Sequence, residues 1–228
     1  MIELGTPRGF VLDGEAMALH GQRAVHWPAA DALLIADLHL GKGEAFRRAG
    51  MAVPRGGTAA DLARLAALLA GTRASRLVIL GDVLHGSLHD DAAWRADWDA
   101  FRAAHADVRV DAILGNHDRA LRPAGAAALG LVIRDDGAIE RELALCHEPD
   151  RAPPGRPSLC GHLHPAVPVP GLGRLPAFWW RARRGQLVLP AFSAFTGRVA
   201  PRAAAEDRFL ACAGHQVLPP MPCPPRRR

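Results

Sequence analysis

Lysine, tyrosine and long apolar runs are scarce or missing in this chain. Among 228 residues there is no tyrosine, and Lys42 is the only lysine. The net charge of +5 therefore comes almost wholly from arginine, which binds phosphate through two forked hydrogen bonds. An anionic substrate is plausible on this ground, although an excess of arginine and alanine is also a common compositional bias unrelated to function.

No apolar run approaches the roughly 18 residues that a membrane-spanning helix requires. The first residues, MIELGTPRGFVLDGE, carry acidic side chains and lack the apolar core of a signal peptide. We therefore expect a cytoplasmic protein without a membrane partner. The four cysteines are not arranged in CxxC pairs, so we expect them to be reduced.

The hydrophobic pattern predicts one domain, because 49% hydrophobic residues suffice for a sizeable core. Strands alternate with helices in the first half of the chain and follow one another in the second half. This order favours an α/β fold with two packed sheets. We assign residues 1–218 to the domain. Residues 219–228, PPMPCPPRRR, are expected to be disordered because proline interrupts both helix and sheet.

Local patterns predict individual elements. Residues 10–19 and 24–27 are expected to form a hairpin, residues 47–57 a basic loop, and residues 139–146 one strand. A helix should begin at Thr58, with Asp61 as capping-box partner, and end at Gly71. A second helix is expected over residues 89–106, where Trp94, Trp98 and Phe101 recur at helical spacing.

Apolar runs that end on polar side chains are the most informative feature of the sequence. Ligands gather at the carboxyl ends of strands in open α/β sheets, and residues two apart in an extended segment share a side. Such runs are LLIADLH, RLVILGD, AILGN, LALCH and SLCGHLH, and they deliver Asp37, His39, Asp82, Asn116, His147, His162 and His164.

These seven donors are too many for one zinc-like ion. They suit two divalent ions roughly 3.5–4 Å apart that share one carboxylate. A mixed set of oxygen and imidazole donors is compatible with manganese, iron or zinc. Two such ions acidify a water molecule to hydroxide that can attack phosphorus in line.

The motifs D-x-H, G-D, G-N-H-D, H and G-H-x-H, from Asp37 to His164, resemble the calcineurin-like metallophosphoesterase superfamily. The resemblance implies an α/β/β/α sandwich and a dinuclear centre, for which we favour manganese. Asp37, His39, Asp82 and His164 would hold one ion, and Asp82, Asn116, His147 and His162 the other. His117 would protonate the leaving oxygen, and Asp118 would hold the His117 ring in place.

A narrower resemblance connects DLHLGKGEAFRRAGMAVPRG and PAFSAFTG with the bacterial ligase-associated DNA damage response endonucleases. It implies a phosphodiesterase that acts on DNA in repair, with a DNA ligase and a helicase as partners. Lys42 and Arg48 lie in a basic stretch suited to a DNA backbone, and a solvated loop is the alternative for each arginine. Together with His85 they are the candidates for substrate binding.

Two other functions stay open. Protein phosphatases of the superfamily carry an arginine shortly after G-D, whereas this chain has Val83, Leu84 and His85 there. The missing arginine favours diesters, but a nucleotide hydrolase or phosphomonoesterase remains an alternative. A non-catalytic scaffold is a third possibility, against which the full donor set argues.

Overall fold

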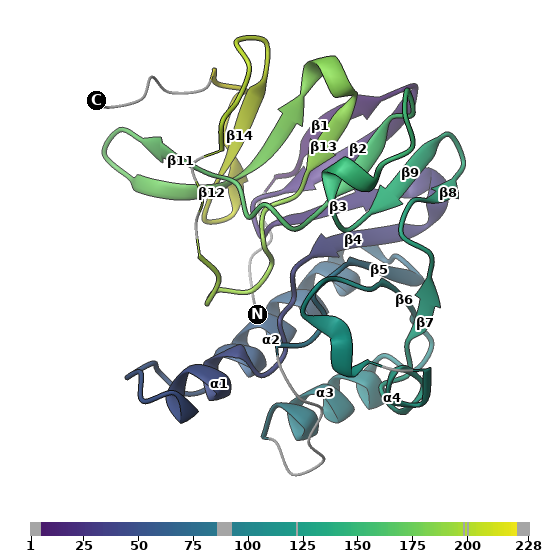
Figure 1. Ribbon diagram of the computed structural model, residues 1–228, viewed down its shortest axis with the longest axis vertical. Coiled ribbons are helices and arrows are strands. Elements are labelled where there is room, and N and C mark those ends of the chain that lie inside the picture. The colour runs from purple at the N-terminus through teal and green to yellow at the C-terminus, as the bar shows by residue number, and fades with distance from the viewer. Residues whose placement is uncertain (1–5, 86–92, 122, 198, 200, 223–228) are drawn as a thin grey trace.

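The computed structural model describes residues 6–85, 93–121, 123–197, 199 and 201–222. Two β-sheets pack face to face, and the longer helices cover the outer face of the first sheet (Figure 1). None of the helices within these ranges is long and apolar enough to cross a membrane.

The first sheet has seven strands in sequential order, β1 to β7. Strands β1 to β4 pair antiparallel, and β4 to β7 pair parallel. Strands β4, β5 and β6 therefore end at one edge of the sheet, with Ala36 opposite Leu80. The strands are β1 (Arg8–Leu12), β2 (Glu15–His20), β3 (Ala24–Trp27), β4 (Ala32–Ala36), β5 (Arg76–Leu80), β6 (Arg109–Ile113) and β7 (Val132–Arg134).

The second sheet has eight strands in the order β15-β14-β12-β13-β10-β9-β8, with β11 beside β12. Strands β9, β10 and β13 are parallel, so their carboxyl ends also share an edge. The strands are β8 (Ala138–Glu140), β9 (Leu143–Cys146), β10 (Ser158–Cys160), β11 (Ala166–Val169), β12 (Gly173–Arg181), β13 (Gln186–Val188), β14 (Arg208–Ala213) and β15 (Gln216–Val217).

The helices are α1 (Lys42–Arg48), α2 (Gly57–Thr72), α3 (Ala93–Ala104) and α4 (Pro123–Ala128), with 3-10 turns η1 (Pro28–Ala30), η2 (Asp118–Ala120), η3 (Pro149–Arg151) and η4 (Ala182–Arg184). Alternation along β4 explains the layers, because successive side chains of a strand face opposite sides. Leu33 and Ile35 pack with the helices, whereas Leu34 and Ala36 pack between the sheets with Phe178.

The predicted two-sheet sandwich is confirmed. On the outer face of the second sheet, the described residues contribute 3-10 turns and loops in place of an α-helical layer. Cys146 and Cys160 are buried in the core on that face, beside Trp179, as expected of small apolar side chains.

Several predicted boundaries are wrong. Residues 10–19 form two strands, joined by a turn in which Asp13 and Gly14 have φ angles of 49° and 81°. Residues 139–146 likewise form β8 and β9. Aspartate followed by glycine is a strong hairpin signal, and here it separates residues 10–19 into two short strands in place of the single predicted one.

The ends of two helices also differ from the prediction. Helix α2 begins after Gly56, without a side-chain cap, and ends beyond Gly71 at Thr72, where Arg73 follows in left-handed geometry. Asp61 accepts a hydrogen bond from the Ala194 amide, so it does not cap the helix. Helix α1 lies partly where a loop was expected, and His89 of the second predicted helix is outside the described residues.

Residues 219–222 of the expected tail belong to the described part of the chain. Met221 pairs with Phe209 in an antiparallel bridge, with N–H···O distances of 2.8 and 2.9 Å. The remainder of the expected tail, residues 223–228, lies outside the described residues.

Candidate metal centre

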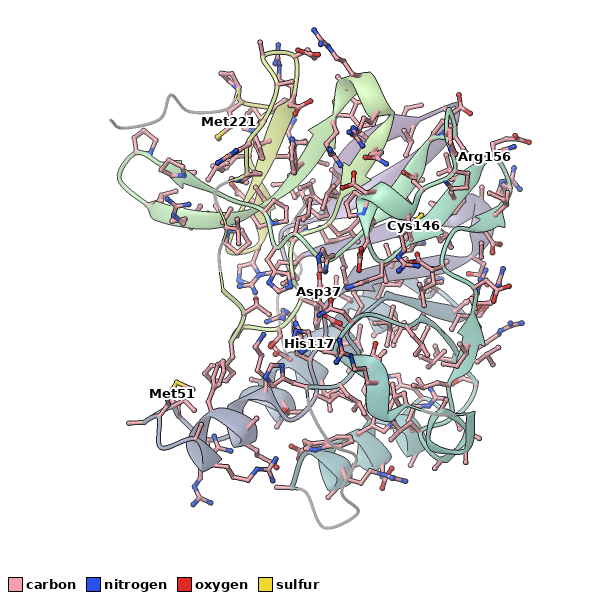
Figure 2. All side chains as sticks on the ribbon, viewed as in Figure 1. Asp37, Met51, His117, Cys146, Arg156 and Met221 are labelled. Atoms are coloured by element: carbon pink, nitrogen blue, oxygen red, sulfur yellow. The ribbon has the colours of Figure 1, made fainter. Side chains whose placement is uncertain are left out.

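All seven predicted donors lie on segments that leave strand ends at one rim of the sandwich. Asp37 and His39 follow β4, Asp82 follows β5, and Asn116 follows β6. His147 comes directly after β9, and His162 and His164 follow β10. Figure 2 shows Asp37 and His117 between the two sheets and the helical layer. Both sheets therefore contribute side chains to one site.

The backbone at this rim is unusual. Asp37, His39, Asp82, His162 and His164 have φ angles of 54°, 50°, 46°, 71° and 45°. Non-glycine residues rarely adopt this left-handed region, and strained backbone of this kind concentrates at functional sites. Five of the seven donors are thus held in a costly conformation that turns their side chains to one place.

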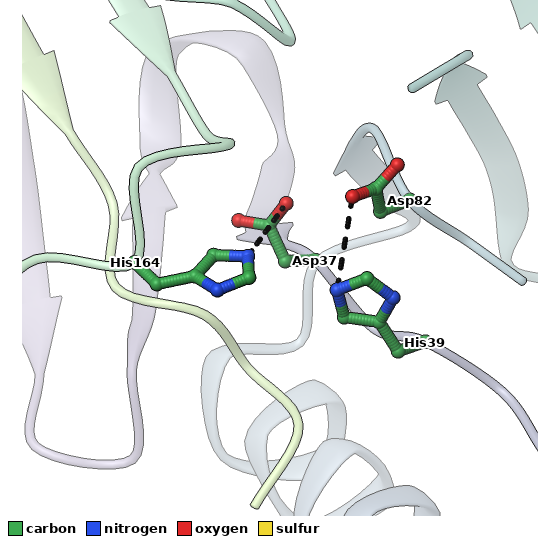
Figure 3. A group of neighbouring side chains, drawn as sticks. All are labelled: Asp37, His39, Asp82 and His164. Carbon is green, nitrogen blue, oxygen red and sulfur yellow. Dashed lines mark ion pairs between the residues drawn. The ribbon is translucent and has the colours of Figure 1, made fainter. Parts of the chain in front are cut away.

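One group of four side chains forms a compact cluster (Figure 3). Asp37, His39, Asp82 and His164 each offer a ligand atom, and these atoms lie within 4.8 Å of one another. His39 Nε2 is 3.7 Å from Asp82 Oδ2, and His164 Nε2 is 3.5 Å from Asp37 Oδ1. These separations leave room for a cation between the donors.

A second group adjoins the first. His147 Nε2 lies 3.2 Å from Asn116 Oδ1, 3.1 Å from His162 Nδ1 and 3.7 Å from Asp82 Oδ1. Asp82 therefore faces both groups, with one oxygen toward His39 and the other toward His147. This is the position that a bridging carboxylate needs.

The chemistry of the donor set fits divalent cations. Asp37 and Asp82 are buried, and a buried carboxylate requires a compensating charge. Both ring nitrogens of His39, and Nε2 of His164, are buried without a hydrogen-bond partner among the described residues. Burial lowers the pKa of His39, and Lys42 lowers it further. A neutral imidazole with an unused lone pair is the form that binds metal.

Two glycines make the close approach possible. A Cβ atom at Gly81 would lie 1.8 Å from His147 Nδ1, and the φ angle there is +81°. A Cβ atom at Gly115 would lie 2.2 Å from Asp82 Oδ1. Glycine therefore precedes Asp82 and Asn116 because no side chain fits between the two strand ends.

His117 and His85 lie against the first cluster. The exposed His117 ring is 5.3 Å from the His39 ring and stacks on His85 at 5.0 Å. The His117 amide donates to Asp82 Oδ1 at 2.9 Å. Burial lowers the pKa of His85 to about 4, with Lys42 and His117 adding to the effect. Two imidazoles thus border the space in front of the donors.

Asp118 has other hydrogen-bond partners than the predicted one. Its buried carboxylate accepts hydrogen bonds from the amides of Val83, Leu84 and Gly115 at 3.1, 2.8 and 2.8 Å, and no hydrogen bond to the His117 ring occurs among the described residues. Burial raises the pKa of Asp118 to about 6, against the effect of these amides. Asp118 therefore braces the loops that carry Asp82 and Asn116.

The two basic candidates differ in position. Lys42 is buried at the start of α1, and the charges of Asp37 and Asp82 partly oppose the lowering of its pKa by burial. Arg48 is exposed at the other end of α1. Only Lys42 therefore faces the donor cluster directly.

A segment after β13 supports the centre in a way that the sequence did not reveal. The Phe192 amide donates to Ala36 O at 2.7 Å, and the Ser193 amide donates to Asp37 O at 3.3 Å. Arg23 donates to three carbonyls of this segment, and the Arg64 guanidinium lies 4.2 Å over the Phe192 ring. The motif PAFSAFTG was the available signal in the sequence. Its hydrogen bond to Asp37, however, depends on residues far away in the chain.

Comparison with known proteins agrees with this geometry. Residues 31–186 match the family model described as calcineurin-like phosphoesterase. The chain belongs to that family and is a metal-dependent phosphoesterase, as the resemblance of its motifs implied. The clustered aspartates and histidines of the family match indicate divalent metal binding.

A solved structure gives a more specific likeness. The chain is 36% identical to the Pseudomonas putida nuclease MPE, with a TM-score of 0.77 over 95% of this chain and 100% of that one. The comparison with curated proteins found no match. The nuclease is consistent with the narrower resemblance to bacterial endonucleases.

Proposed function

We propose that this protein is a dinuclear, manganese-dependent phosphodiesterase that cleaves DNA as an endonuclease. One observation carries the proposal: seven donors from both sheets meet around Asp82, which faces His39 on one side and His147 on the other. A similar nuclease adds support for a phosphodiester substrate. In the sequence, Asp82 is followed by Val83, Leu84 and His85, and not by the arginine that clamps the dianion of a monoester in protein phosphatases of the superfamily.

Asp37, His39, Asp82 and His164 would hold one ion, and Asp82, Asn116, His147 and His162 the other. Two divalent ions supply Lewis acidity that lowers the pKa of the attacking water and stabilises charge on the phosphate oxygens. The protein itself orients the substrate. Lys42, at the start of α1, and His85, which stacks on His117, would contact the phosphate.

His117 is the proton donor of the proposed reaction. Its ring is exposed next to the donor cluster, and stacking on His85 fixes its plane. The hydrogen bond from its backbone amide to Asp82 Oδ1 fixes its distance from the centre. The imidazolium would transfer its proton to the leaving oxygen of the cleaved strand.

The biological setting follows the same resemblance. We propose that the enzyme acts in the cytoplasm in DNA repair, alongside a DNA ligase and a helicase. Arg48 would contribute to binding of the DNA backbone, as its exposed position beyond Lys42 allows.

The test of the activity compares two small chromogenic substrates and a supercoiled plasmid. With manganese, bis-p-nitrophenyl phosphate should be hydrolysed faster than p-nitrophenyl phosphate, and the plasmid should be nicked. Asp82→Asn should abolish both activities, whereas Asp150→Asn, an exposed carboxylate, should keep them. Faster turnover of the monoester would instead identify a phosphomonoesterase or nucleotide hydrolase.

The test of the proton donor uses leaving groups. His117→Ala should retain bound manganese and slow turnover roughly 10²–10⁴-fold, with the larger loss on the poorer leaving group. The control is His215→Ala, since His215 is exposed in the turn between β14 and β15. Equal losses for good and poor leaving groups would contradict the role.

A further inference from the structure

Residues 42–56, which comprise α1 and the loop to α2, project from the body of the molecule beside the metal centre (Figure 1). We call this segment the arm. It contains four basic side chains, Lys42, Arg47, Arg48 and Arg55, and one acidic side chain, Glu44. The arm is therefore strongly positive. The role of Lys42 at the metal centre accounts for only one of its four cationic side chains.

The base of the arm is fixed to the catalytic face. Glu44 Oε1 accepts a hydrogen bond from the Trp94 amide at 2.9 Å, so the acidic side chain is occupied. The Phe46 ring lies 5.9 Å from the His85 ring. Gly57 leaves no space for a side chain, because a Cβ atom there would lie 1.9 Å from the Phe195 ring. The arm thus has a defined direction relative to the donors.

The loop of the arm is held by its own hydrogen bonds. Arg47 Nη1 donates to Pro54 O at 3.0 Å. The amides of Gly50 and Met51 donate to the carbonyls of Arg47 and Phe46, each at 3.0 Å. These hydrogen bonds close the loop on itself, and preorganised elements of this kind lose little entropy on binding.

The tip exposes an apolar side chain between cations. Residues 48–52 are all exposed, and Met51 is 46% exposed. Figure 2 places Met51 at the outer end of the arm, away from Asp37 and His117. Arg48 and Arg55 are exposed on either side of it in the sequence.

We propose that the arm grips the DNA strand whose phosphate is bound at the metal centre. Arg48 and Arg55 pair with backbone phosphates, and Met51 packs against or between bases, as apolar side chains of nucleic-acid-binding proteins do. The positive charge of the arm selects this occupant over a neutral or basic protein. This inference rests on the proposed function and extends it to a second contact.

Geometry sets the position of the contact. A seven-residue helix spans about 10 Å at 1.5 Å per residue. A DNA strand advances about 3.4 Å per nucleotide, so the tip meets the strand roughly three nucleotides from the cleaved bond. A small diester cannot reach it.

The experiment compares Met51→Ala and the double variant Arg48→Gln/Arg55→Gln with matched controls. Leu172→Ala removes an apolar side chain that is 57% exposed, and Arg73→Gln changes an exposed arginine at the far end of α2. Full-length proteins are assayed with manganese on a labelled 20-nucleotide strand and on bis-p-nitrophenyl phosphate. Binding of the strand is also measured by fluorescence anisotropy in EDTA.

Met51→Ala should lower kcat/KM on the long strand about tenfold more than on the small diester. The double variant should reduce the slope of log(kcat/KM) against log salt by about 1.4–1.8, from 0.7–0.9 for each lost phosphate contact. Both arm variants should bind the strand more weakly, and both controls should behave as wild type.

Arm variants that lose no more than the controls, in kinetics and in anisotropy, would overturn the inference. A wild-type protein that hydrolyses neither substrate would refute the proposed function instead. Because anisotropy needs no hydrolysis, weakened binding by the arm variants would then still support the arm, and unchanged binding would still reject it.

Discussion

Replacement of Asp118 by alanine tests whether this carboxylate braces the metal loops or serves His117. In the structure it accepts three amide hydrogen bonds, from Val83, Leu84 and Gly115. Val83 and Leu84 are fully buried, at 0% and 1% exposure, so their amides would find no water. We therefore expect Asp118→Ala to lower both the free energy of unfolding and the affinity for manganese.

The magnitude follows from the unpaired amides. A buried donor left without a partner costs about 1–3 kcal/mol, which gives roughly 3–6 kcal/mol for two buried amides and a partly buried one. Burial of the carboxylate is itself unfavourable, since the pKa of Asp118 is raised to about 6. Its removal recovers roughly 3 kcal/mol of that loss, at about 1.4 kcal/mol per pKa unit, so we expect about 1–2 kcal/mol net. Misplacement of Asp82 and Asn116 should weaken manganese binding about 10–100-fold.

Urea unfolding followed by tryptophan fluorescence measures the first effect, and isothermal titration with manganese the second. Asp118→Asn should lose less, because one carbonyl oxygen can keep the bonds to Val83 and Gly115 that Oδ2 makes. His117→Ala, at an exposed position, should change stability little. If Asp118→Ala unfolds like wild type and merely slows turnover as His117→Ala does, the bracing role is refuted and the ring-orienting role restored.

Three further changes probe other parts of the structure. Gly81→Ala, whose Cβ would lie 1.8 Å from His147 Nδ1, should weaken manganese binding at least tenfold in the same titration, and wild-type affinity would show that the strand ends can move apart. Burial lowers the pKa of His20 from 6.5 to about 4. The unfolded chain therefore takes up this proton first, and stability should fall by up to about 3 kcal/mol as the pH drops from 6.5 through 4; His20→Leu should reduce this acid sensitivity, and an unchanged pH profile would contradict it. Asp111 is fully buried beneath three arginines, so Asp111→Ala should cost about 3 kcal/mol in urea unfolding, whereas a loss no larger than for the surface control Asp99→Ala would count against this network.

The candidate site was largely predictable because its signal is local to each strand. Every apolar run that ends at a polar residue became a buried strand, and parallel pairing of β4, β5 and β6 brings their ends together without further information. The two-residue spacing from Asp37 to His39, and from His162 to His164, also brings both side chains of each pair to the site. It does so through left-handed backbone, however, and not through the extended segment that the prediction assumed.

The contacts of Asp118 and Asp61 were not predictable, because both depend on tertiary neighbours. Asp118 follows His117 in the chain, which made a contact between their side chains plausible, yet the carboxylate points inward to Val83 and Leu84. Asp61 has the spacing of a capping-box partner from Thr58, but the helix begins earlier, at Gly57, and the carboxylate binds the Ala194 amide and Arg64 instead. Sequence neighbours show which residues are near, and only packing decides which way each side chain turns.

The short helix α1 escaped prediction for a different reason. It has seven residues and a left-handed glycine before it, with no side-chain cap, so the usual helix start signals are missing. Its stability comes from contacts at its base, such as Glu44 with Trp94. A helix this short is marginal by itself.

The rim where the two sheets end has a mechanical consequence. Donors on the first sheet are joined to donors on the second by the chain itself and by non-covalent contacts, of which the backbone pairing of Ala36 with Ala191 is one. Cations bound at Asp82 and its neighbours would link the first sheet of the sandwich to the second. Removal of the ions by a chelator should then lower the stability of the whole protein as well as abolish its activity. The melting temperature should therefore report how many ions are bound.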